Sequence, residues 1–224
     1  MRVVIRVGGS VAASPINPEL INKYASLLKE IKHKGHEVVV VTGGGQLARE
    51  FIATAKSLEL PMQAQDELAI SVSRLFAQLF QKKLASDACS KIAATLDEAA
   101  ECLSDGKIMF MGGLRPGITT DTVAALVAER IGADLLLKGT DQDGIYNKDP
   151  RKHKDAVKLD RISFDSLQSV LEESEHKAGI HQIVDPEAVK VLRRTRVKLV
   201  VVNGFKPENI RAALNGMKVG TIVD

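Results

Sequence analysis

Three apolar segments that each end in glycines constrain the fold of this chain more than any other feature. They are residues 2–7, which precede Gly8-Gly9-Ser10, residues 37–41, which precede Thr42-Gly43-Gly44-Gly45, and residues 107–111, which precede the loop 112–121. Helical patterns follow these loops, and strands that alternate with helices predict a mainly parallel sheet with right-handed crossovers. We therefore expect an α/β fold whose glycine loops share the carboxyl edge of the sheet.

The pattern of apolar residues predicts the other elements. Further strands are expected at residues 133–137, 197–202 and 219–223, the last of them at the edge of the sheet. Helices are expected at residues 18–34, 46–58, 65–81, 96–103, 122–130, 162–171, 185–194 and 207–214. The helix at 65–81 has too many apolar residues for a single-faced surface helix, so we expect it to be buried or to lie at a subunit interface.

The length of 224 residues fits a single domain with two lobes. Residues 151–160 are charged and poor in apolar side chains, which is typical of a lobe boundary or a mobile flap. We expect residues 1–137 to form the first lobe and residues 138–224 to form the second.

Composition argues against several classes of protein. Lys and Arg total 31 against 28 Asp and Glu, a net charge of +3, and no basic run suggests a nucleic-acid groove. No apolar run approaches the about 18 residues of a membrane span, and no signal-peptide pattern is present, so we expect a cytoplasmic protein with small-molecule partners. Cys89 and Cys102 are too few and too irregularly placed for a zinc site or a disulfide framework, so we expect reduced thiols and no structural metal.

The loop 112–121 has the composition of a phosphate site. It holds three glycines, a Pro-Gly turn and the hydroxyls of Thr119 and Thr120 just before a helix. Backbone N–H groups at a helix N-terminus stabilise anions, and adjacent glycines can turn consecutive N–H groups toward one anion. A lone Gly-Gly pair more often serves tight packing, but three such loops favour binding of more than one phosphate. No G-x-x-x-x-G-K-[ST] or G-x-G-x-x-G motif is present, which argues against P-loop kinases and nicotinamide dehydrogenases.

Together these segments resemble a known family. The segments concerned are Gly8-Gly9-Ser10, Gly43-Gly44-Gly45 with Arg49, Asp66, the 112–121 loop, and Asp141-Gln142-Asp143-Gly144-Ile145-Tyr146 with Asp149-Pro150. In combination they resemble the amino acid kinase family, and most closely its archaeal branch that phosphorylates UMP. The resemblance covers essentially the whole chain. It implies a three-layer αβα sandwich with a mainly parallel central sheet, assembled as a homohexamer, that transfers the γ-phosphoryl of ATP to UMP and gives UDP.

The resemblance also implies a role for particular residues. In the first lobe, UMP would contact Gly44, Asp66, Leu114, Arg115, Pro116, Gly117, Ile118, Thr119 and Thr120. ATP would contact Gly8, Gly9, Ser10, Gly45 and Arg49 through its phosphates, and Thr140, Tyr146 and Asp149 of the second lobe through its adenosine. A carboxylate such as Asp66 is a suitable acceptor for ribose hydroxyls, with a helix cap or a solvated acid ahead of the helix as the alternative.

Phosphoryl transfer depends on neutralising charge between two anionic substrates, so the candidate catalytic groups are cations. The resemblance places Arg6, where many relatives carry lysine, and Lys138, where only some do, beside the transferring group. Lys138 could instead be a surface lysine, and Asp121 either orients the two cations or caps the helix that it opens. Mg²⁺ is expected to bridge ATP oxygens with few protein ligands.

Two alternatives remain open. The first is a kinase of the same fold that acts on a carboxylate, a carbamate or isopentenyl phosphate. Isopentenyl phosphate kinases use a histidine on the helix after the second glycine loop to hold the acceptor phosphate. No histidine lies between His36 and His153, which argues against isopentenyl phosphate as the acceptor. The second is a nucleotide-binding protein without catalytic activity, for which the arginine at position 6 is the only support in the sequence.

Overall fold

The computed structural model describes residues 1–103, 105–175 and 183–224. These residues form one central seven-stranded sheet and the helices around it. The strands are β1 (Arg2–Val7), β2 (Glu37–Thr42), β3 (Met109–Met111), β4 (Leu135–Thr140), β5 (Arg161–Ile162), β6 (Lys198–Asn203) and β7 (Thr221–Val223). They lie in the order β3-β2-β1-β4-β6-β7-β5. The β6–β7 pair is antiparallel, and the other pairs of neighbouring strands are parallel, as the sequence predicts.

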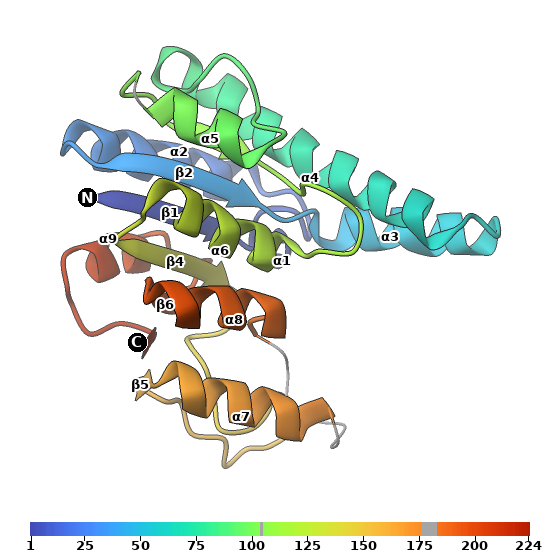
Figure 1. The fold of residues 1–224 in the computed structure, drawn as a ribbon, viewed down its shortest axis with the longest axis vertical. Coiled ribbons are helices and arrows are strands. Elements are labelled where there is room, and N and C mark those ends of the chain that lie inside the picture. The colour runs from blue at the N-terminus through green and yellow to red at the C-terminus, as the bar shows by residue number, and fades with distance from the viewer. Residues whose placement is uncertain (104, 176–182) are drawn as a thin grey trace.

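Helices connect these strands (Figure 1). They are α1 (Gly9–Ala12), α2 (Pro18–His33), α3 (Gly45–Ser57), α4 (Met62–Leu84), the 3-10 helix η1 (Ala85–Asp87), α5 (Leu96–Leu103), α6 (Thr120–Ile131), α7 (Phe164–Glu175), α8 (Pro186–Thr195) and α9 (Glu208–Leu214). Local signals explain several of their ends. Asn17 caps α2 by accepting a hydrogen bond from the Leu20 N–H at 3.0 Å, and Gly132 ends α6 in the left-handed region.

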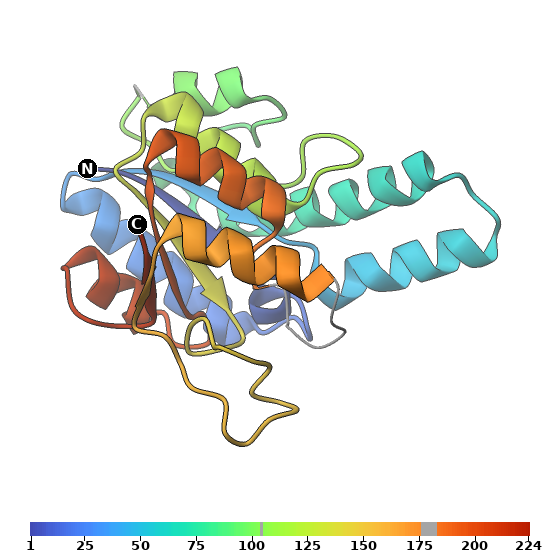
Figure 2. The same ribbon diagram turned by 60° about the horizontal axis from the view of Figure 1, so that its bottom comes forward.

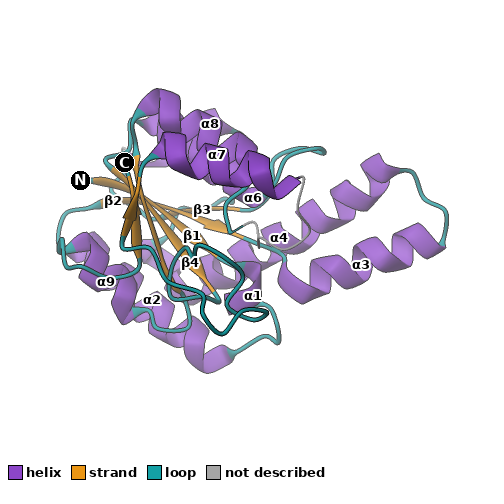
Figure 3. Ribbon diagram, turned by 90° about the horizontal axis from the view of Figure 1, so that it is seen from below, coloured by secondary structure: helices purple, strands orange, loops and turns teal. Residues whose placement is uncertain are grey.

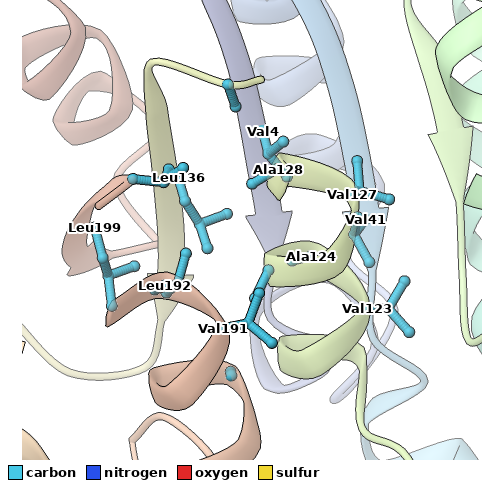
Figure 4. Close-up of a cluster of buried hydrophobic side chains, with 14 of the residues drawn as sticks. Val4, Val41, Val123, Ala124, Val127, Ala128, Leu136, Val191, Leu192 and Leu199 are labelled. Atoms are coloured by element: carbon cyan, nitrogen blue, oxygen red, sulfur yellow. The ribbon is translucent and has the colours of Figure 1, made fainter. Parts of the chain in front are cut away.

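Alternate residues of the central strands face two separate cores. Val4, Val41 and Leu136 pack against α5, α6, α7 and α8 on one face, where Val123, Val127 and Leu192 are buried with them (Figure 4). Ile5, Val40 and Leu137 pack against α2, α4 and α9 on the other. Helices therefore cover both faces of the sheet, as Figure 3 shows, and the expected three-layer αβα sandwich is confirmed.

The helices α3 and α4 form a hairpin that projects beyond the sheet (Figure 2). Val72, Phe76 and Phe80 of α4 are buried, whereas Leu75 and Leu79 are 58% and 42% exposed. The apolar excess of this helix is thus buried on one face and left exposed on another. In the part of the chain that the structure describes, no helix is long and apolar enough to cross a membrane.

Two details of the predicted fold are wrong. The closing strand β7 is not at the edge of the sheet, because the two-residue strand β5 pairs with it in parallel and forms that edge. A strand of two residues is too short to show the alternation of apolar and polar side chains that marks a strand. The sequence analysis therefore missed β5 and began the predicted helix at residue 162. The loop after β1 is also partly helical, since Gly9–Ala12 form the short α1.

The prediction of reduced thiols is wrong as well. Cys89 and Cys102 form a disulfide, and their Cα atoms lie 6.4 Å apart. The helix α5 brings Cys102 back beside Cys89, whose segment runs parallel to β3. Spacing along the chain could not reveal this pairing, because the disulfide depends on how the intervening residues fold.

Candidate active site

The glycine loops after β1 and β2 pack directly against each other at the carboxyl edge of the sheet. The Gly8 N–H donates to the Gly139 carbonyl at 2.9 Å, and the Gly43 N–H donates to the Val7 carbonyl at 3.1 Å. A Cβ on Gly9 would lie 2.1 Å from the Gly45 nitrogen, and Gly45 itself has a φ of +59°. Only glycine permits this close approach, which occurs at the loops where the sequence predicted phosphate contacts.

The loop 112–120 is held from beneath by α4. Ser73 Oγ accepts from the Gly113 N–H at 2.8 Å, and Arg74 donates to the carbonyls of Gly113 at 2.9 Å and Leu114 at 3.1 Å. Asp66 Oδ2 accepts from the Gly117 N–H at 2.8 Å. These bonds fix the loop backbone, and they show that Asp66 does not cap α4, whose first residue is Met62.

A cavity of about 140 Å³ lies between this loop and α3 and α4. Six of its lining residues are among those predicted for UMP, namely Gly44, Asp66, Arg115, Ile118, Thr119 and Thr120. Leu114 instead packs partly into the hydrophobic core. The volume is below the about 300 Å³ typical of a whole small-molecule site, so this cavity alone is too small for a complete ligand of that size.

Three charged side chains meet beside this cavity. Arg6 and Lys138 are register partners on β1 and β4, and both form ion pairs with Asp121, the Arg6 Nε–Asp121 Oδ1 distance being 2.8 Å. Arg6 Nη2 also donates to Thr120 Oγ1 at 3.1 Å, which connects the charged cluster to the cavity lining. The side chain of Lys138 is 7% exposed, so it is not a surface lysine.

Burial and the neighbouring charges set the protonation of this cluster. Burial lowers the pKa of Lys138 to about 8, against the opposing effect of the Asp121 carboxylate. Burial would raise the pKa of Asp121, but the charges of Arg6 and Lys138 outweigh it and leave that pKa lowered. Asp121 is therefore ionised at neutral pH. Thr119 caps α6, so Asp121 is not the helix cap, and its carboxylate pairs with the two cations instead.

The residues predicted for adenosine lie at the end of β4 and in the segment that follows it. Thr140 is the last residue of β4 and is buried, as is Asp149, whose carboxylate accepts from the Arg151 N–H at 3.0 Å. The segment that carries Tyr146 is tied to β7, because the Ile145 N–H donates to Thr221 Oγ1 at 2.8 Å. On the β2 side, Arg49 is exposed and donates to Gln46 Oε1 at 3.1 Å. Residues of both halves thus border one edge of the sheet, but the described contacts do not join them into a single cavity.

Three residues near the site were missed by the sequence analysis. Ser73 and Arg74 contact a loop about forty positions away, and Asp185 contacts Thr122, in the first turn of α6, from 63 positions away. Asp185 was identified only as a helix start, and nothing local in the sequence marks such long-range partners. Among the described residues no group of three or more His, Cys, Asp or Glu side chains could hold a metal ion.

Comparison with known proteins gives a consistent picture. Residues 1–203 match the model of the amino acid kinase family. A uridylate kinase from Methanocaldococcus jannaschii is 41% identical over 226 residues, which cover 100% of both chains, and one from Methanococcoides burtonii is 39% identical over 94% of this chain and 89% of its own length.

Solved structures of kinases that act on UMP also resemble this chain. The crystal structure of a uridylate kinase from Archaeoglobus fulgidus is 35% identical and covers 100% of both chains with a TM-score of 0.90. A UMP kinase structure from Bacillus anthracis, 21% identical with a TM-score of 0.84 over 100% of this chain and 95% of its own, shares the fold. The chain therefore belongs to the amino acid kinase family.

Proposed function

We propose that this chain is a uridylate kinase, which transfers the γ-phosphoryl group of ATP to UMP and gives UDP and ADP. The observation that carries the proposal is the contact between Arg6 and Thr120, because it joins a buried pair of cations to the cavity of the acceptor loop. Full-length relatives at 35–41% identity that are named uridylate kinase support UMP as the acceptor.

On the acceptor side, UMP lies in and above the cavity between α4 and the loop 112–120. Asp66 uses one carboxylate oxygen to hold the Gly117 N–H, and its other oxygen is available to a ribose hydroxyl. Thr119, Thr120 and Ile118 border the same cavity and would enclose the base. Gly44 would allow the α-phosphate to approach the backbone where β2 meets α3.

On the donor side, the ATP phosphates lie over the packed glycine loops, at Gly8, Gly9, Ser10 and Gly45, with Arg49 as a further cation. The adenosine extends over the end of β4 toward Thr140, Tyr146 and Asp149. The residues 1–137 would then form the UMP lobe and the residues 138–224 the ATP lobe, although a single sheet runs through both.

The transfer step needs in-line alignment and charge neutralisation more than it needs covalent chemistry. Lys138 and Arg6 supply two cations in a site that excludes most water, where they stabilise the negative charge of the transferring phosphoryl group. Asp121 holds both cations from one side and fixes their spacing. An arginine at position 6 offers a planar fork in place of a point charge.

Mg²⁺ accompanies ATP in this proposal and lowers the charge of its phosphates when bound. Asp121, the carboxylate of the charged cluster, is already paired with Arg6 and Lys138, so ATP oxygens and water would be the main ligands of the ion.

The exposed apolar side chains of the α3–α4 hairpin favour association with further copies of the chain. Phe51, Leu58, Met62, Leu75 and Leu79 are each more than a third exposed, and a monomer would leave them in water. The proposed assembly is a homohexamer in which this hairpin lies between subunits.

An acceptor panel tests the proposed function. The protein is incubated with Mg-ATP and, separately, UMP, CMP, AMP, carbamate, a carboxylate acceptor and isopentenyl phosphate, and ADP formation is measured. UMP should give the highest kcat/KM. Turnover of another acceptor without turnover of UMP would overturn the uridylate assignment, and absence of any turnover would favour a nucleotide-binding protein.

A further inference from the structure

Asp185 makes more contacts than a helix cap requires. Its Oδ1 accepts from the Ala188 N–H at 3.0 Å, which is the usual capping bond of α8. Its Oδ2 accepts from the Thr122 hydroxyl at 2.7 Å, the Thr122 N–H at 3.1 Å and the Thr119 hydroxyl. One carboxylate thus binds the first turns of two helices, α8 in the second half of the chain and α6 in the first.

These contacts determine how α6 begins. Thr119 Oγ1 accepts from the N–H groups of Asp121 at 3.1 Å and Thr122 at 3.2 Å, and its own proton goes to Asp185. The Asp185 backbone also contributes to lowering the pKa of the Asp121 side chain. Asp185 therefore restrains the backbone of Asp121 through Thr119. Downstream of this turn, α6 and α8 pack together through buried residues such as Ala124 and Val191 (Figure 4).

We propose that Asp185 is a positioning residue for phosphoryl transfer: by holding the first turn of α6, it keeps Asp121 aligned with Arg6 and Lys138. This inference rests on the proposed function. Because Thr119 and Thr120 line the acceptor cavity in the same turn, Asp185 also holds the end of the acceptor loop. A change at one residue of the second half would then alter both the acceptor site of the first half and the cation pair, to which Arg6 of the first half and Lys138 of the second contribute.

Charge gives this role a signature that a simple cap lacks. The titratable and charged groups that face Lys138 are Arg6 from β1, Asp121 from α6 and Asp185 from the segment before α8. Burial lowers the pKa of Lys138 to about 8, and the negative charge of Asp185 opposes that shift. Removal of this charge should lower the pKa further, so the loss of kcat at alkaline pH should begin at a lower pH.

The test uses Asp185→Asn, because asparagine caps helices as well as aspartate does but carries no charge. We expect kcat for UMP to fall about tenfold or more, since a buried charged acceptor of several hydrogen bonds is lost, and the alkaline limb to move to lower pH. Thr122→Val should also lower kcat. Because both substitutions break the same contact, kcat of the double variant should be only slightly below that of Asp185→Asn alone.

Asn17→Ala serves as the matched control, because Asn17 caps α2 ahead of a proline as Asp185 caps α8, without a bond to α6. It should lower the melting temperature but leave the pH profile of kcat unchanged. Hydrogen exchange of residues 114–122 should rise in Asp185→Asn and stay at the wild-type rate in Asn17→Ala.

Wild-type kcat and wild-type pH dependence in Asp185→Asn would overturn the inference and reduce Asp185 to a cap. If the wild-type protein itself does not phosphorylate UMP, the proposed function fails instead. Exchange at residues 114–122 then still decides whether Asp185 restrains α6, and an unchanged rate in Asp185→Asn would contradict that restraint.

Discussion

Replacement of Lys138 by methionine separates the catalytic role of this residue from its structural role. Methionine conserves the length of the side chain and removes the charge from a position where lysine is only 7% exposed. Water cannot readily take the place of the lost ammonium group, so we expect kcat to fall by about 10², which corresponds to about 2.7 kcal/mol of transition-state stabilisation. An exposed ion pair would be worth at most about 1 kcal/mol.

The fold should tolerate this substitution. Asp121 keeps Arg6 as a partner at 2.8 Å, so no buried charge is left unpaired, and the loss of stability should stay below the about 3–5 kcal/mol that an orphaned buried charge costs. The wild-type enzyme should also lose kcat as the pH rises above about 8, because deprotonation then removes the ammonium charge, and Lys138→Met should lack this limb.

The assay is steady-state ADP formation with UMP from pH 6 to 10, with thermal unfolding followed by circular dichroism on the same samples. A kcat within about threefold of wild type, with the alkaline limb intact, would refute the catalytic role of Lys138. A large loss of melting temperature would instead show that the cluster is needed for folding.

Further predictions address other parts of the site. In steady-state kinetics Asp66→Asn should raise the KM for UMP by about tenfold or more and leave the KM for ATP unchanged. A KM for UMP equal to that of the wild type would exclude the ribose contact. Arg6→Lys should keep much of the activity, whereas Arg6→Ala should lower kcat by about 10² in the same assay. Gly45→Ala should destabilise the protein by well over about 1 kcal/mol in denaturant unfolding, because its Cβ would lie 2.3 Å from the Gly9 carbonyl oxygen. Gly216→Ala is the control, since it has a similar φ of +74° and nothing within 4 Å. Light scattering at micromolar concentration should give the mass of a hexamer, and a monomeric mass would contradict the proposed interface on α3 and α4.

Much of the fold could be predicted because its signals are local. Apolar runs identified the strands β1, β2, β4 and β6, and glycine or proline marked several helix ends. Apart from the two short elements α1 and β5, the errors concern which segments pair. The pairing of β7 with β5 and the disulfide between Cys89 and Cys102 both depend on contacts between distant segments, which leave no periodic pattern in the sequence.

The candidate site divides in the same way. The glycine loops and the cations were found from motifs and from the family resemblance, and the register of β1 against β4 explains why Arg6 and Lys138 lie side by side. The supporting contacts of Arg74 and Asp185 could not be predicted, because an arginine in a helix and an aspartate before one have ordinary local interpretations. Only the folded chain shows what these side chains hold.

The fate of the γ-phosphoryl group tests the central claim most directly. The protein is incubated with UMP and Mg-ATP labelled in the γ-phosphate, and the labelled products are separated. The label should appear in UDP, with one ADP formed for each UDP, and it should do so at a rate reduced about 10² in Lys138→Met. Label that appears only as inorganic phosphate, or in UDP at the same rate in both proteins, would contradict the account.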